Sequence, residues 1–317
     1  MTIQTPIIPS PCTGICTMDE ALGFCLGCAR TREEIEEWAN APPSRRLAIW
    51  DELPARCEEL KIPITRLPWP PDQIAAFAAA ALKENSGTWV LGCYGACAEF
   101  FYPQGEGFEV SASGGAVTAL SKQGALRLSI GSYARALQLR PGHGGGGSEA
   151  IFLVIAKTRA SLPAASVLTP LGPDEGAIDP GARCYPLFDL GIGRADLRFC
   201  VRLAAPELAD VLIRLSGRPL EEVLAKAGSL LIKHSPARVV ETVLGRAEIF
   251  TPIPPPGSAP ALGPHTHLLP SLLSAGRSAP PGIDLPPAYA LGATFYPKPV
   301  PPGNTHPCSQ TACRGGL

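Results

Sequence analysis

Residues 11–28 read PCTGICTMDEALGFCLGC, and they decide how the N-terminal part of the chain folds because they hold four cysteines within seventeen positions. The cysteines follow the pattern C-x3-C-x8-C-x2-C: Cys12, Cys16, Cys25 and Cys28. Four thiols this close together either ligate a metal or pair as two disulfides. The redox compartment of the protein decides between these two interpretations.

Two features of the sequence favour reduced thiols. The first fourteen residues, MTIQTPIIPSPCTG, lack the basic start and the long apolar run of a secretory signal peptide. The longest helix-compatible apolar run covers residues 75–82, far below the roughly 20 residues that a membrane span needs. We therefore expect a cytoplasmic protein, in which thiols stay reduced. Eleven cysteines are also an odd number, which complete disulfide pairing could not use up.

Composition limits the classes of partner. The formal net charge is −1 and only 17% of the residues are charged, so no electrostatic argument favours nucleic acid or an anionic membrane. We expect neither as a partner. Hydrophobic residues make up 45% of the chain, enough for a buried core, while 36 prolines and 33 glycines predict many turns.

The first 60 residues are predicted to form a compact metal-binding module. Thr31, followed three positions later by Glu34, has the form of a capping box and predicts a helix start just after the last cysteine. Ser44 is the expected cap of a second helix. Apolar residues recur there at helical spacing: Leu47, Trp50 and Leu53. The prediction is a cysteine loop followed by a helical hairpin.

The rest of the chain is predicted to be larger and mostly antiparallel, which makes the fold class α+β. Residues 61–71 are rich in proline and indicate a linker. Residues 72–250 combine an alanine-rich helix, glycine-bounded strands and two later helices, with no recognisable function. Residues 251–317 hold 16 of the 36 prolines and four charged residues, so we expect an extended C-terminal tail without long ladders or helices.

Four thiolates suit either an iron–sulfur cluster or a tetrahedral zinc ion. A zinc ribbon separates its two C-x2-C pairs by about 15–20 residues, whereas the gap between the cysteine pairs here is eight. A cluster of several irons accepts wrapping by such a tight loop more readily. The helix start at Thr31, together with Arg30 and Arg32, would bring positive charge toward an anionic site. An iron–sulfur cluster is thus the expected cofactor, with zinc as the alternative.

The same region resembles a bacterial family called domain of unknown function 1289. The resemblance covers about 50 residues, namely the four cysteines and the sequence that follows them: Gly27, Arg30, Thr31, Glu34, Ile35, Trp38, Arg46, Leu53 and Pro54. Members of this family are commonly described as predicted iron–sulfur proteins. The resemblance implies a metal module and no reaction, and residues 72–317 extend well beyond its usual length.

A second candidate metal site is the pair His265 and His267 in the sequence GPHTHLLP. In an extended segment, residues two apart lie on one face, so both imidazoles could ligate one ion. Such a site needs a third ligand, for which His234 and Glu248 are the nearest candidates. The alternative is a structural pair that anchors the proline-rich segment.

Other motifs carry weaker signals. Gly142, Gly144 and Gly147 match G-x-G-x-x-G around His143, but a β-rich run follows them instead of a helix, which indicates a hairpin loop. Six further cysteines have alternative interpretations, as a second half-site, as core residues or as an oxidation-prone tail: Cys93, Cys97, Cys184, Cys200, Cys308 and Cys313. Packed core cysteines are the favoured interpretation of Cys93 and Cys97.

Three functional hypotheses remain. The first is an iron–sulfur module, serving redox chemistry or structure, joined to a domain of unknown role. The second is a structural zinc module that docks a protein partner of unidentified kind. The third is a metal-dependent enzyme that uses His265 and His267, with the cysteine module as an accessory.

Overall fold

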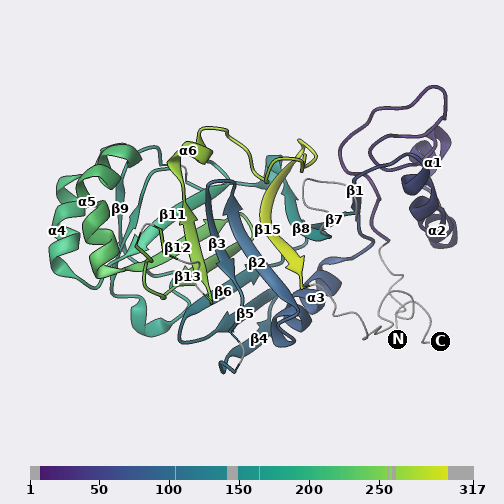
Figure 1. The fold of residues 1–317 in the computed structure, drawn as a ribbon. Coiled ribbons are helices and arrows are strands. Elements are labelled where there is room, and N and C mark those ends of the chain that lie inside the picture. The colour runs from purple at the N-terminus through teal and green to yellow at the C-terminus, as the bar shows by residue number, and fades with distance from the viewer. Residues whose placement is uncertain are drawn as a thin grey trace.

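Two antiparallel β-sheets lie face to face and form the body of the domain that follows the N-terminal helices (Figure 1). The computed structural model describes residues 8–103, 105–140, 149–163, 165–255, 257–258 and 262–298. The predicted α+β class is confirmed: a small helical region precedes the larger sheet domain. Six helices are described: α1 (Arg32–Glu37), α2 (Pro43–Glu59), α3 (Pro71–Lys83), α4 (Pro206–Arg214), α5 (Leu220–His234) and α6 (Pro270–Leu273).

The order of the strands within each sheet differs from their order along the chain, although most neighbouring strands are consecutive. The seven-stranded sheet runs β1 (Ile64–Arg66), β7 (Arg135–Leu139), β8 (Ala150–Ala156), β15 (Tyr289–Pro297), β2 (Gly87–Cys93), β3 (Ala96–Phe100), β14 (His265–Leu268). The eight-stranded sheet runs β4 (Glu109–Ser113), β5 (Ala116–Leu120), β6 (Gly124–Ser129), β13 (Gly245–Ile249), β12 (Ala237–Thr242), β11 (Leu197–Arg202), β10 (Pro186–Asp189), β9 (Thr169–Pro173).

The main core lies between the two sheets. Alternate residues of each strand face inward, as the period-2 geometry of a strand requires; Trp89 and Leu91 of β2 are almost fully buried against Val240 of β12 and its neighbours. Helix α3 contributes Ile74 and Ala78 to the same core, and α4 and α5 cover one end of the sandwich. The opposite face of the seven-stranded sheet carries a smaller apolar cluster, which includes Leu137, Phe152 and Leu291.

The N-terminal module contacts the seven-stranded sheet at its β1 edge. Strand β1 lies inside residues 61–71, expected as a linker, and pairs with β7. Arg140, just after β7, forms an ion pair with Glu58 of α2 and donates a hydrogen bond to the carbonyl of Pro54 at 3.4 Å. The Tyr289 hydroxyl donates to the carbonyl of Cys12 at 3.3 Å. These contacts hold the cysteine loop next to the start of β15.

Both predicted helices of the module are present, and Leu53 of the second is buried as expected, but the buried stripe is rotated away from Leu47. Its N-cap is Pro42 without a side-chain cap, so Ser44 does not serve as expected. Leu47 is 53% exposed. The buried positions recur every four residues instead: Ile49, Leu53 and Cys57. The apolar stripe is therefore rotated about the helix axis relative to the expected one. Helical spacing alone did not identify the buried stripe, because α2 has apolar residues at several positions around its axis.

The C-terminal region differs from the expected tail. Strand β15 spans nine residues and lies between β8 and β2, in the interior of the seven-stranded sheet. A strand forms there because the prolines cluster on both sides of the segment and leave residues 289–296 free of them. Gly292 sits at a register shift in this strand, where an added Cβ would collide with Leu244. The high proline content of residues 251–317 as a whole therefore led to the wrong expectation for residues 289–297, which form a central strand.

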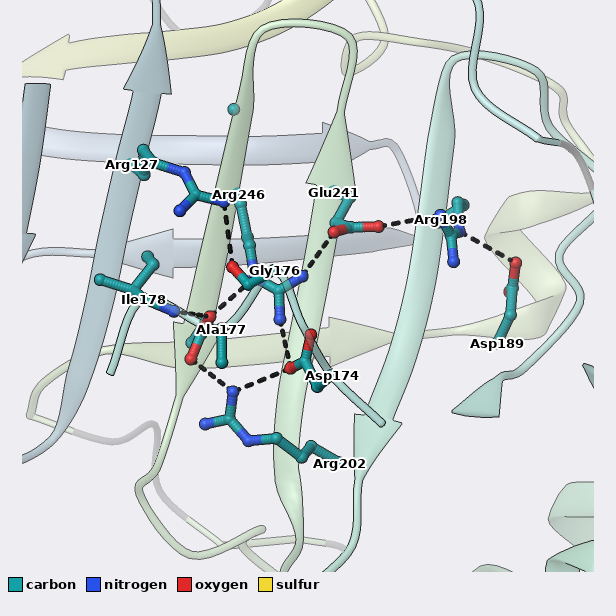
Figure 2. A network of polar contacts seen from close by, with 12 residues as sticks. Arg127, Asp174, Gly176, Ala177, Ile178, Asp189, Arg198, Arg202, Glu241 and Arg246 are labelled. Atoms are coloured by element: carbon teal, nitrogen blue, oxygen red, sulfur yellow. Dashed lines mark hydrogen bonds and ion pairs between the residues drawn. The ribbon is translucent and has the colours of Figure 1, made fainter. Parts of the chain in front are cut away.

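A buried network of ion pairs covers the outer face of the eight-stranded sheet (Figure 2). Glu248 of β13 is fully buried and accepts hydrogen bonds from Arg246 at 2.7 Å, Arg202 at 2.6 Å and the backbone N–H of Ile178 at 2.8 Å. Asp174, in the loop that covers this face, binds the same two guanidinium groups. The network thus joins three strands to that loop.

In the parts of the chain that the structure describes, no helix combines the length and the apolar character needed to cross a membrane.

Candidate metal centres

The cysteine loop is built around a tight turn at its second cysteine pair. The carbonyl of Cys25 accepts hydrogen bonds from the N–H groups of Cys28 at 3.3 Å and Ala29 at 2.7 Å. Ala29 has a positive φ of 56°, which lets the chain reverse immediately after Cys28. Two antiparallel bridges close the rest of the loop: Met18 with Cys25, and Phe24 with Thr31. Local hydrogen bonds therefore fix the positions of Cys25 and Cys28.

The segment that carries the first cysteine pair packs directly on this turn. The Thr13 hydroxyl donates to the carbonyl of Gly27 at 2.9 Å, and both groups are buried. A Cβ at Gly27 would collide with the Ile15 carbonyl and lie 2.8 Å from the Thr13 hydroxyl. Glycine is thus required by close approach, which explains why the residue inside the second pair is part of the pattern.

The four sulfur atoms have different surroundings. Cys25 and Cys28 are buried, Cys12 is half-buried and Cys16 is exposed. The N–H of Gly14 donates to the sulfur of Cys12 at 3.3 Å, and the Nε of Arg30 donates to the sulfur of Cys28 at 3.4 Å. Donors of this kind stabilise thiolates, the form that binds metals. The site has a buried wall and one edge at the surface.

The pKa values follow from this arrangement. Burial raises the pKa of the Cys28 thiol to about 11, although the hydrogen bond and charge of Arg30 act in the opposite direction. The charge of Cys12 raises the pKa of Cys16, and burial and Cys25 add to the effect. The thiols are therefore close enough to oppose one another's ionisation, which a bound cation would reverse.

Arg30, Arg32 and the start of the helix at Thr31 were expected to bring positive charge to the cysteine sulfurs, and one of the three, Arg30, does so. Arg30 is 3% exposed, with its guanidinium 5.0 Å from the centroid of the Trp38 ring. Arg32 points to solvent. The start of α1 is occupied by its own capping box: Glu34 N–H donates to the Thr31 hydroxyl at 3.2 Å, and Thr31 N–H donates to the Glu34 carboxylate at 3.0 Å. Arg30 is accordingly the group that faces the sulfurs.

We predict that Arg30→Met weakens metal retention by the module by about 10–100-fold, the usual effect of removing a hydrogen-bond partner of a ligand. Arg32→Met is the matched control, because it removes the same charge two residues away without touching a sulfur. The measurement is metal content after dialysis against increasing concentrations of a chelator. Equal losses in both variants would mean that general charge, and not the contact with Cys28, retains the metal.

A second group of potential ligands lies on the seven-stranded sheet. Glu99 of β3 and the two histidines of β14, His265 and His267, have donor atoms that all lie within 4.8 Å of one another. Among the described residues this is the one such group. The hydrogen bond from His267 lowers the pKa of Glu99, which keeps its carboxyl group ionised.

The third member of this group was not predicted. Glu248 is committed to its arginines, and His234 lies 3.9 Å from Glu207 at the far end of α5. Sheet register, which pairs His265 with Glu99, brings the carboxylate to the histidines. Local spacing in the sequence does not predict a contact between Glu99 and His265, because these residues lie far apart in the chain.

The remaining candidates do not assemble into a site. Cys93 lies in the core and Cys97 on the outer face of the β2–β3 hairpin, so they point to opposite sides of the sheet. Cys200 is buried in a different small cluster and Cys184 is exposed. The glycine motif at 142–147 with His143, and the pair Cys308 and Cys313, lie outside the described residues.

Two family models match the chain. Residues 10–57 match a protein of unknown function (DUF1289), which confirms the resemblance inferred from the cysteine spacing. Residues 73–311 match a family of unknown function (DUF6925). No curated protein and no solved structure matches the chain. The chain therefore belongs to the family of unknown function DUF6925, and carries a DUF1289 region in front of it.

Proposed function

We propose that the N-terminal module binds an iron–sulfur cluster through Cys12, Cys16, Cys25 and Cys28. The observation that carries the proposal is the contact between the buried Arg30 guanidinium and the sulfur of Cys28, within a loop that supplies all four thiols. A buried arginine aimed at sulfur is expected where the sulfur bears negative charge. Thiolates that share one site need a cation to balance them, and the donor set suits iron.

The spacing of the cysteines along the sequence supports an iron–sulfur cluster over zinc. The two cysteine pairs are separated by eight residues, whereas the two C-x2-C pairs of a zinc ribbon are separated by about 15–20. A cluster that contains several irons and sulfides accepts wrapping by such a tight loop more readily than a single ion does.

The residues of the loop have separable roles in this proposal. When bound, the cluster supplies one-electron transfer. Cys25 and Cys28 hold its buried side, where Arg30 offsets part of the negative charge. Cys16 lies on the exposed edge, through which electrons would be exchanged with a partner. The tight packing at Gly27 keeps the two cysteine pairs in register. A purely structural cluster would use the same contacts.

The test is the metal and acid-labile sulfide content of the full chain purified without oxygen, together with its visible absorption spectrum. We expect iron and sulfide in matching amounts and a broad brown absorption that bleaches on reduction. One zinc per chain in a colourless protein would contradict the proposal. That result would instead support the alternative function, a structural zinc module that docks a protein partner.

A further inference from the structure

The outer face of strands β3 and β14 collects ligand-type side chains at the edge of the seven-stranded sheet. His265 is paired directly with Glu99, and His267 with Cys97. Because residues two apart on a strand share a face, His265 and His267 project on the same side as Glu99. The neighbours of Glu99 on β3, Ala98 and Phe100, point the other way into the core.

The donor atoms converge at distances that suit one metal ion. The Nε2 atoms of His265 and His267 lie 3.1 Å apart. The Glu99 carboxylate lies 3.2 Å from Nε2 of His267 and 3.6 Å from Nε2 of His265. Donors bound at about 2.1 Å are separated by about 3.0 Å around an octahedral ion and about 3.4 Å around a tetrahedral one. The three separations of 3.1, 3.2 and 3.6 Å lie near these values, and the two histidines approach different oxygens of the Glu99 carboxylate.

The backbone fixes which nitrogen of His265 is available. Nδ1 of His265 lies 3.0 Å from the carbonyl of Gly263, which can only accept a hydrogen bond, so Nδ1 carries the proton. The lone pair of the neutral ring is then on Nε2, the nitrogen directed at His267 and Glu99. Metal-binding histidines are oriented in this way, by a hydrogen bond from the other ring nitrogen to a carbonyl or carboxylate.

The surroundings wall the group on one side and leave the other open. The His265 side chain is 12% exposed and packs edge-on against Phe101, whose ring centroid is 6.0 Å away. The side chains of His267 and Glu99 are 41% and 33% exposed. An ion held here would have three protein ligands on its inner side and positions for water or substrate on its outer side.

We propose that Glu99, His265 and His267 form a binding site for a divalent transition-metal ion, with open coordination positions facing solvent. Two imidazoles and one carboxylate favour ions such as Zn²⁺, Fe²⁺ or Co²⁺ over Ca²⁺ and Mg²⁺, which prefer oxygen ligands alone. The site lies on the sheet domain and shares no residue with the cysteine loop. It is therefore independent of the iron–sulfur proposal.

The test is a titration of the chelator-treated full chain with Co²⁺, followed by its visible absorption, and with Zn²⁺ by calorimetry. Cobalt at the cysteine loop gives sulfur-to-metal charge-transfer bands, whereas cobalt at nitrogen and oxygen ligands does not. We expect the parent protein to bind cobalt at two sites: one at the cysteine loop, with these bands, and one at Glu99, His265 and His267, without them. Glu99→Gln and His267→Ala should each weaken this site at least about tenfold and leave the charge-transfer bands unchanged.

His234→Ala is the matched control, because His234 also faces a glutamate, Glu207, on the surface but has no third ligand. It should leave both cobalt sites intact. A second measurement guards against misfolding: Zn²⁺ should raise the thermal unfolding temperature of the parent and of His234→Ala, but raise it less in His267→Ala. Unchanged cobalt binding at nitrogen and oxygen ligands in both site variants would overturn the proposal.

Discussion

Cys28→Ala is expected to abolish iron binding by the full chain, and Cys25→Ala is expected to do the same. Both thiols lie on the buried wall of the loop, where water cannot replace a missing ligand easily. Each substitution also removes a sulfur that is held by a specific contact: Arg30 donates to Cys28, and Cys25 donates to the carbonyl of Ile15 at 3.2 Å. The measurement is iron and sulfide per chain in anaerobically purified protein.

The matched control for these variants is Cys57→Ala. Cys57 is a buried thiol of the same module, 4% exposed, but it lies on α2 in an apolar cluster with Ile49, Leu53 and Ile62 and is not one of the four cysteines of the loop. This control should keep its iron even if it loses some stability, since removing a small buried group costs a protein about 1 kcal/mol. Full iron content in Cys28→Ala would exclude Cys28 as a ligand.

The parts of the fold that the sequence predicted correctly are those set by neighbouring residues. The capping box of Thr31 and Glu34 is present in full, and the helix expected just after the last cysteine, α1, begins at Arg32. These features depend on contacts three or four residues apart, which spacing reveals directly. The loop that carries the four cysteines also closes through local hydrogen bonds, whereas metal binding by these cysteines stays a prediction.

The parts that the sequence did not predict depend on strands that are distant in the chain. Glu99 meets His265 only because β14 pairs with β3, and nothing in either segment specifies that pairing. The place of β15 in the interior of a sheet depends likewise on β8 and β2. Glu248, a candidate third ligand of the histidine pair, is instead bound by arginines from two strands. In each case the contact depends on which strands pair and in which register, and local patterns in a single sequence do not reveal this.

Arg246→Met is expected to destabilise the sheet domain by about 3–5 kcal/mol, the usual cost of leaving a buried charge without its partner. The Arg246 guanidinium binds three carboxylates, those of Glu248, Glu241 and Asp174, at 2.5–2.7 Å. Methionine would fill much of the space but leave Glu248 and Asp174, both nearly inaccessible to solvent, to share Arg202 alone. The measurement is the free energy of unfolding in urea at pH 7.

The loss should depend on pH in a direction that the pKa of Glu248 sets. In the parent protein burial tends to raise this pKa, but the charges of Arg246 and Arg202 and the N–H of Ile178 outweigh it, so the pKa lies below its ordinary value of 4.5. The stabilisation is therefore present above that value and is lost as the pH falls through the folded-state pKa. Without Arg246 the folded-state pKa should rise, so protonation would relieve part of the loss.

The deficit of Arg246→Met should accordingly be largest at pH 7 and smaller at pH 5. Arg127→Met, on the paired position of the adjacent strand β6, is the matched control. Arg127 donates one hydrogen bond, to the carbonyl of Gly176 at 3.0 Å, and forms none of the buried ion pairs of Figure 2. Its loss should cost no more than about 1 kcal/mol and should not vary with pH. Equal, pH-independent losses in the two variants would show that arginine packing, and not the pairing of buried charge, holds this face of the sheet together.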